Sequence, residues 1–297
     1  MSVVFFDDRY VLDHVDFDTT RKAGWVAESL VADPVAGVEL SVVSDSDVTD
    51  EMLLVHTSRY VDEVRYPTDW SRGSNWFPQG PEVFDWACAH VRGMLAAITE
   101  VVLTGANHGT LSSGFHHAKP GCGNGYCTFN GLAVAAVHAH ALGFLSHTGS
   151  DTDPVVAVLD VDAHMGGGTF ACVGSDPRVV LADVSTNSFD LWYPSADRHR
   201  IWFADPDTYL DRVETAARFV IDRGPSVVLY NAGMDPFDDG VPADVLMQRE
   251  VLVARLLGEA GIPVAWCLAG GYTDRLTRDE LVGLHRYTVT AFATGGS

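Results

Sequence analysis

The chain has 297 residues, 47% of them hydrophobic and 20% charged, which is enough apolar content for a large core and too little charge for a disordered chain. Forty acidic residues against 19 basic ones give a formal net charge of −21, which argues against nucleic acid or an anionic membrane as a partner. The same charge would attract a cationic substrate, but we favour the simpler interpretation that it keeps the protein soluble.

The N-terminal segment MSVVFFDDRY is acidic where a secretory signal peptide is basic. No uninterrupted apolar run reaches the roughly 18 residues that a membrane helix needs. The five cysteines are few and odd in number for a disulfide framework, and Cys122 and Cys127 lack the second pair that a zinc ribbon requires. We therefore expect a cytoplasmic protein that does not enter a membrane.

Segments of two kinds then alternate along the chain. Short apolar runs are typical of buried parallel strands, and longer segments with helical spacing of apolar residues lie between them. In chain order they predict helix Glu82–Thr99, strand Val101–Thr104, helix Leu132–Ala141, strands Val155–Leu159 and Val179–Val184, helix Pro206–Arg223, strand Val227–Tyr230, helix Ala243–Ala260, strand Val264–Leu268 and helix Thr277–Phe292. This alternation predicts a three-layer α/β/α fold with a central, mostly parallel sheet, in a single domain over residues 1–297.

Polar side chains follow several of the predicted strands. Ligands of parallel sheets bind outside the carboxyl ends of the strands, so residues just after different strands meet at one edge. The polar residues at these positions are Asp160, Asp162, Ser185, Asp235 and Tyr272. The sequence therefore predicts a functional site at this edge of the sheet.

The segment VLDVDAHMGGG contains the first candidate metal ligands. Asp160, Asp162 and His164 alternate, so their side chains point the same way in an extended chain, although a loop of solvated acids would show the same pattern. Asp235, in NAGMDP, would add a ligand from another strand. Three protein ligands with an open fourth position are typical of catalytic zinc, and iron or cobalt would suit the same donors. Two carboxylates neutralise the charge of the ion, so its water would be only weakly acidic and an additional base is needed.

Two further segments supply candidates for that base and for an oxyanion donor. His116 and His117 are adjacent in SGFHHAKPG, and one could act as the base, although paired histidines also occur as surface decoration. Tyr272 follows two glycines in LAGGYTD, which let the backbone approach a site closely. Its hydroxyl could donate to a developing oxyanion, or it could be a buried core tyrosine.

At this point the chain resembles the histone deacetylase and acetylpolyamine amidohydrolase family, which has the arginase-deacetylase fold. The matching segments, in the order of the family, are GFHHAK, NGYCTFNG, LDVDAH, AGMDP and AGGYT, which together cover roughly Ser112 to Tyr272. The resemblance implies a zinc-dependent hydrolase that removes an acyl group such as acetyl from an amine such as acetyl-lysine or an acetylpolyamine.

The resemblance also implies roles for individual residues. One zinc ion per chain would be held by Asp162, His164 and Asp235. One of His116 and His117 would act as general base, with Asp160 paired to His116, and the pair would later protonate the leaving amine, while Tyr272 would stabilise the oxyanion. The implied walls of a substrate tunnel are Gly125, Tyr126 and either Trp192 or Tyr193, and the implied ligands of a structural potassium ion are Asp160, Asp162, His164 and Ser185.

The chain departs from the family at three places. Gly167 stands where the family has a carboxylate or amide that would orient His117. Unless another group replaces that side chain, His117 should be less basic and less fixed. Met165 also departs from the usual run of the family. Gly166 disfavours a binuclear site, and the loop TNSFDLWYPSAD differs from the usual one. These departures leave two alternatives open: a binding or regulatory protein with little or no turnover, and a deacylase of a small specialised metabolite.

Overall fold

A single eight-stranded sheet forms the centre of the protein. The computed structural model describes residues 1–68, 74–77, 80–142 and 156–294. The strands are β1 (Ser2–Phe6), β2 (Val38–Val42), β3 (His108–Ser113), β4 (Val156–Asp160), β5 (Val179–Ser185), β6 (His199–Phe203), β7 (Val227–Ala232) and β8 (Val264–Leu268). Their order across the sheet is β2-β1-β3-β8-β7-β4-β5-β6, and every pairing between these strands is parallel. The predicted parallel α/β fold is confirmed.

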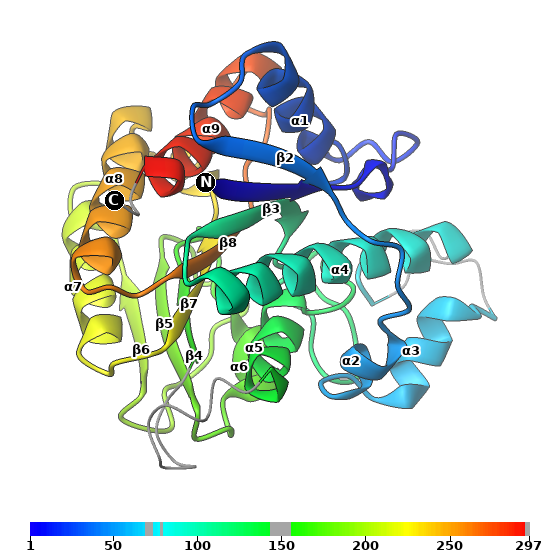
Figure 1. Ribbon diagram of the computed structural model, residues 1–297. Coiled ribbons are helices and arrows are strands. Elements are labelled where there is room, and N and C mark those ends of the chain that lie inside the picture. The colour runs from blue at the N-terminus through cyan, green and yellow to red at the C-terminus, as the bar shows by residue number, and fades with distance from the viewer. Residues whose placement is uncertain (69–73, 78–79, 143–155, 295–297) are drawn as a thin grey trace.

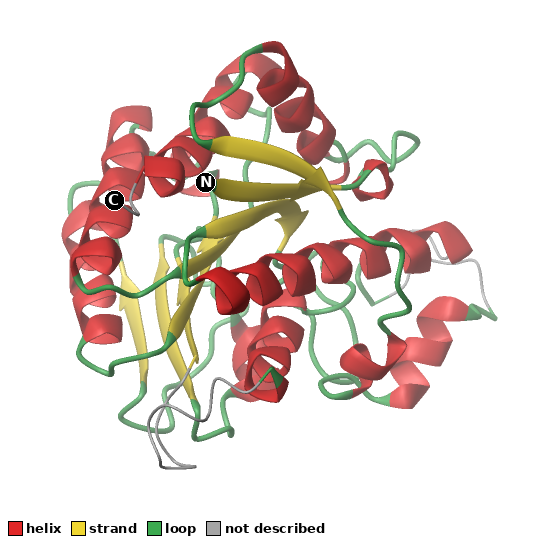
Figure 2. Ribbon diagram, viewed as in Figure 1, coloured by secondary structure: helices red, strands yellow, loops and turns green. Residues whose placement is uncertain are grey.

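Helices cover both faces of this sheet (Figures 1 and 2). One face carries α4 (Pro81–Thr104), α5 (Gly131–Ala141) and α6 (Gly167–Val173), with α2 (Thr49–Leu53) and α3 (Ser58–Arg65) beside them. The other face carries α1 (Lys22–Ala32), α7 (Tyr209–Ile221), α8 (Ala243–Glu259) and α9 (Arg278–Thr294). The arrangement is the three-layer architecture that the sequence predicts.

The strands are buried on both faces, which explains why they appear as continuous apolar runs. Successive side chains of a strand point to opposite faces. Val158 and Leu229 therefore pack under α4 and α5, while their neighbours Leu159 and Tyr230 pack under the helices of the other face. Each central strand thus joins two separate apolar layers.

One predicted strand is wrong. Val101–Thr104 is the last turn of α4, and the strand that follows it is β3. Val101 is buried and Leu103 is exposed, as on an amphipathic helix, and the helix ends only at Gly105, which adopts a left-handed conformation with φ 67°. The β-branched pair Val101 and Val102 favoured a strand, whereas the buried strand β3 contains histidine, threonine and serine and gave no apolar signal.

The other predicted elements are confirmed with small shifts of their ends, and Val155 of one predicted strand lies outside the described residues. The sequence missed β1, β2, β3 and β6 and the helices α1, α2, α3 and α6. Helices α2, α3 and α6 are short and β3 is largely polar, so their stability comes from packing onto the central elements. Strand β1 is an apolar run and α1 has apolar residues at helical spacing, so the sequence did carry a signal for these two.

Helix α4 is long and apolar enough by composition to cross a membrane. In the fold it lies against β3 and α5, and Trp86, Met94 and Ile98 are buried there. Its apolar content is therefore that of a core helix.

Candidate functional site

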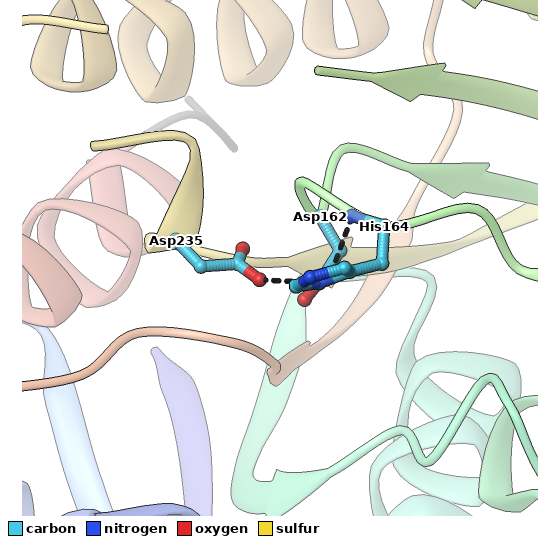
Figure 3. Close-up of side chains that lie close together, drawn as sticks. All are labelled: Asp162, His164 and Asp235. Atoms are coloured by element: carbon cyan, nitrogen blue, oxygen red, sulfur yellow. Dashed lines mark hydrogen bonds and ion pairs between the residues drawn. The ribbon is translucent and has the colours of Figure 1, made fainter. Parts of the chain in front are cut away.

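The three predicted metal ligands meet at the carboxyl edge of the sheet. Asp162 and His164 follow β4, and Asp235 begins a short 3-10 turn after β7. Figure 3 shows the three side chains pointing toward one another. Nδ1 of His164 lies 3.2 Å from Oδ1 of Asp162 and 3.0 Å from Oδ2 of Asp235, and one possible ligand atom from each residue lies within 4.8 Å of the others. The arrangement is a possible metal-binding triad.

Backbone amides fix the carboxylates of this triad. The amide of Gly270 donates to Oδ2 of Asp162 over 2.7 Å, and the amide of Ala163 donates to Oδ1 of Asp235 over 3.0 Å. A Cβ at Gly270 would lie 2.1 Å from Oδ2 of Asp235, and one at Gly233 would lie 2.6 Å from the Cα of Asp162. The glycines of AGMDP and AGGYT are therefore required because the backbone passes directly over the ligands.

The donor set fits a divalent cation. Among the described residues, the buried Oδ2 of Asp235 has no polar partner apart from its contact with Nδ1 of His164. Burial and the nearby charge of Asp162 raise the pKa of Asp235 to about 6, and although burial disfavours a charged imidazole, the two carboxylates raise the pKa of His164 to about 11. The centre therefore favours positive charge, and two carboxylates with one imidazole are ligands that zinc accepts.

A buried ion pair supports the metal loops from beneath. Arg249 and Glu250, on α8, are 0% exposed. Arg249 Nη1 donates to the carbonyl of Gly233 over 2.7 Å and to the hydroxyl of Tyr209 over 2.9 Å. It also donates to the carbonyl of Val161, next to Asp162, over 3.3 Å. The Arg249 side chain thus contacts both loops that carry the predicted ligands, after β4 and after β7. The apolar pattern that predicts helix α8 did not indicate these contacts.

Replacing Arg249 with Met is expected to lower the free energy of unfolding by about 3–5 kcal/mol, because Glu250 then remains as an uncompensated buried charge. The control is Arg255→Met on the same helix, whose exposed pair with Glu259 is worth at most about 0.5 kcal/mol. Urea unfolding followed by tryptophan fluorescence measures both variants. Equal stability losses in the two variants would contradict the supporting role.

The two adjacent histidines lie beside the triad, after β3. Nδ1 of His116 lies 2.7 Å from Oδ2 of Asp160, which is the predicted pairing, and Asn231 donates to the other oxygen of Asp160 over 2.8 Å. Nε2 of His116 lies 3.0 Å from Nε2 of His117 and 3.5 Å from Oδ1 of Asp162. Both rings therefore present Nε2 toward the same space.

The two histidines differ in protonation state because their surroundings shift their pKa values in opposite directions. Burial opposes a charge on His116, but Asp160 and Asp162 raise its pKa to about 10. Burial and the neighbouring His116 lower the pKa of His117 to about 4. At neutral pH the site therefore holds one charged imidazole, which can donate a proton, and one neutral imidazole, which can accept one.

Another group replaces the side chain that Gly167 lacks beside His117, which is the exception that the sequence allowed. Oδ2 of Asp190, from the loop after β5, lies 3.1 Å from Nδ1 of His117. The same carboxylate forms a 2.9 Å ion pair with Lys119. No motif pointed to Asp190, because it lies 23 positions along the chain from Gly167 and reaches His117 only through the fold.

A pocket opens above the triad and encloses about 360 Å³, part of it open to solvent. Tyr272, Gly125 and Tyr126 line it, as predicted, together with Phe17. Gly125 has φ 50°, and a Cβ there would lie 2.6 Å from the ring of His117. Its lack of a side chain lets the pocket wall lie directly on the histidine.

Trp192 and Tyr193 do not line this pocket, which corrects the predicted tunnel wall. Nε1 of Trp192 donates to Oδ2 of Asp183 over 2.9 Å and its ring stacks on Phe170, while Tyr193 is 74% exposed. From the same loop, the ring of Phe189 contacts His117, with the two ring centres 4.9 Å apart. Other aromatic rings that surround Tyr126 are Phe17, Trp76 and Phe77.

Beneath the histidines lies a second polar group. Ser185 donates to Oδ1 of Asp183 over 2.7 Å, and Gly166 donates to Oδ2 over 2.8 Å. Asp183 pairs in register with Asp160 across β4 and β5, and burial together with the charge of Asp160 raises its pKa to about 7. Ser185 thus contacts Asp183, which the sequence did not single out, and Asp183 in turn lies beside Asp160.

The chain is similar to several known proteins. Residues 19–285 match the histone deacetylase domain family. The chain is 27% identical over 214 residues to an uncharacterized protein of Picosynechococcus sp., covering 64% of this chain and 66% of that protein. It is 28% identical over 196 residues to histone deacetylase 2 of Arabidopsis thaliana, covering 59% of this chain and 48% of that protein. The matched region thus spans about two thirds of the first relative and about half of the second.

A solved structure has the same fold over nearly its whole length. The acetylpolyamine aminohydrolase from Burkholderia pseudomallei superimposes with a TM-score of 0.79 at 17% sequence identity, covering 99% of each chain. At that identity the likeness establishes the fold.

Proposed function

Because this chain belongs to the histone deacetylase family, we propose that it is a zinc-dependent amidohydrolase. Its substrate would be an N-acylated amine such as acetyl-lysine or an acetylpolyamine, from which it removes the acyl group. The observation that carries the proposal is a single pocket lined by metal ligands, two histidines in contact and a tyrosine.

Asp162, His164 and Asp235 would hold the zinc ion. When bound, zinc supplies a Lewis acid that polarises the amide carbonyl and lowers the pKa of a water molecule. Iron or cobalt would suit the same ligands. We also propose a structural potassium ion at Asp160, Asp162, His164 and Ser185, where the buried carboxylates supply negative charge.

Different residues around the triad carry out the two proton transfers. His117, neutral and hydrogen-bonded through Nδ1 to Asp190, accepts a proton from water at Nε2. His116, charged through its contact with Asp160, donates a proton from Nε2 to the leaving amine nitrogen. Burial raises the pKa of Tyr272 well above its usual value, so its hydroxyl stays protonated and donates a hydrogen bond to the oxyanion.

The proposal is tested by incubating zinc-loaded protein with an acetyl-lysine peptide, N-acetylputrescine and amides of longer acyl chains, and measuring the amine released. Turnover on one of the acetyl amides, with one zinc per chain, is expected. Tight binding of these amides in calorimetry without turnover would instead favour a binding or regulatory protein. Preference for a different small acyl amine would favour a deacylase of a specialised metabolite. The contact between Asp190 and His117 supports turnover, because it supplies the orienting group that Gly167 lacks.

Replacing Tyr272 with Phe is expected to lower kcat about 10²–10³-fold, because one oxyanion donor is lost while the ring and the metal ligands remain. The matched control is Tyr193→Phe, which removes a hydroxyl from an exposed ring outside the pocket and should leave kcat unchanged. Steady-state kinetics with the best acetyl amide measures both. A Tyr272→Phe variant as fast as the control would exclude the oxyanion role.

A further inference from the structure

The loop between β5 and β6 carries a residue that the family resemblance does not assign. We propose that Asp190 is the positioning residue for His117, and that residue 167 is a glycine because Asp190 occupies the space a side chain would need. The proposal rests on the proposed function, in which His117 accepts the proton from water. It identifies the residue that orients this base.

The contacts of Asp190 make it suited to this role. Its side chain is only 4% exposed, and Oδ2 lies 3.1 Å from Nδ1 of His117 while also accepting the amide of Gly168 over 3.0 Å. A carboxylate can only accept, so it selects the His117 tautomer with a proton on Nδ1. That tautomer leaves the lone pair on Nε2, the atom that faces His116 and the pocket.

A charge partner balances the buried carboxylate. Nζ of Lys119, two residues after His117, lies 2.9 Å from Oδ1 of Asp190. Each oxygen of Asp190 therefore accepts from its own donors, and these contacts oppose rotation of the carboxylate away from the imidazole. The segment that contains the histidine thus also supplies the cation that fixes its partner.

Steric exclusion links Asp190 to Gly167. A Cβ at position 167 would lie 2.2 Å from the backbone oxygen of Asp190 and 2.8 Å from its Cγ. Neither atom can move without losing the contact to His117. A side chain at position 167 is therefore incompatible with the observed position of Asp190. His117 can be oriented by a side chain at position 167 or by Asp190, but not by both.

The loop that carries Asp190 is attached to the metal-binding loop. The amide of Met165 donates to the carbonyl of Phe189 over 3.1 Å, and the amide of Asn187 donates to the carbonyl of Ala163 over 2.8 Å. Asp190 itself has φ 58°, a left-handed conformation that aspartate tolerates better than most residues. The hydrogen bonds and the turn together hold the carboxylate in place before substrate binds.

The test compares Asp190→Ala with Asp197→Ala, an exposed aspartate further along the same connection between β5 and β6. In zinc-loaded protein, Asp190→Ala is expected to lower kcat about 10–100-fold with little change in KM and no change in zinc content, and Asp197→Ala to change none of these. Histidine-selective ¹⁵N NMR supplies a readout independent of turnover: His117 should be protonated on Nδ1 in the wild type and populate the Nε2-protonated tautomer in Asp190→Ala.

A second variant keeps the proposal falsifiable if Asp190→Ala does not fold. Gly167→Ala should displace Asp190 and lower kcat in the same way, and the double variant should be no slower than about the slower single one, because both act through one contact. Full kcat and an unchanged His117 tautomer in Asp190→Ala, or full kcat in Gly167→Ala, would overturn the proposal. A wild type without turnover would instead reject the proposed function, and the tautomer measurement would still decide the role of Asp190.

Discussion

Replacing Asp235 with Asn is expected to remove the bound zinc and reduce hydrolysis to the level of the metal-free protein. The amide of Ala163 donates to Oδ1 of Asp235 over 3.0 Å, so the oxygen of an asparagine would take that position. Its NH2 group would then replace Oδ2 and point at Nδ1 of His164, where a lone pair and a negative charge are needed. Shape is conserved, so the change removes a ligand without opening a cavity.

Zinc content and competition with a chelator measure this effect without an assay of activity. The control is Asp274→Asn, which neutralises an exposed aspartate close in sequence to Tyr272. Full zinc content in Asp235→Asn would mean that the ion binds elsewhere in the chain. Hydrolysis without zinc in any variant would contradict the proposed role of the triad altogether.

Replacing His117 with Ala is expected to lower kcat about 10²–10⁴-fold while zinc content stays at the wild-type level. His117 is the neutral member of the histidine pair, because burial and the adjacent charge of His116 both disfavour its protonation. Without it, the described residues leave His116 as the nearest imidazole, and Asp160 keeps that ring charged and unable to accept a proton. The loss should therefore appear in kcat and not in metal binding.

Steady-state kinetics and metal analysis on the same preparation separate this result from that of Asp235→Asn. The matched control is His14→Ala, an exposed histidine that does not line the pocket, which should leave kcat unchanged. If His117→Ala keeps its rate while His116→Ala loses it, the base is His116 and the assignment of roles within the pair is reversed.

The possible metal-binding triad could be predicted because its three residues are local to strand ends. Asp162 and His164 follow β4 directly, and Asp235 follows β7, the strand that pairs with β4. In a parallel sheet all carboxyl ends lie at one edge, so residues just after neighbouring strands must meet. The glycines of AGMDP and AGGYT belong to the same local signal, because the backbone at these positions touches the ligands.

The predictions failed where a side chain's direction depends on distant packing. The resemblance implied Trp192 or Tyr193 as a tunnel wall, but the ring of Trp192 packs against Phe170 and is hydrogen-bonded to Asp183 outside the pocket. Val101–Thr104 has the composition of a strand, yet it continues a helix whose end is set by Gly105. In both cases a local preference was overridden by the elements that pack around it.

The sequence by itself determined the parallel α/β architecture and the three residues of the possible metal-binding triad, because apolar periodicity and short motifs act over a few residues. Only the tertiary structure decided how those ligands are supported. Asp190 contacts His117 from a loop 73 positions further along the chain, and Arg249 contacts Gly233 and Val161 from helix α8. Such contacts depend on how loops and helices pack in three dimensions, and no spacing along the chain encodes them.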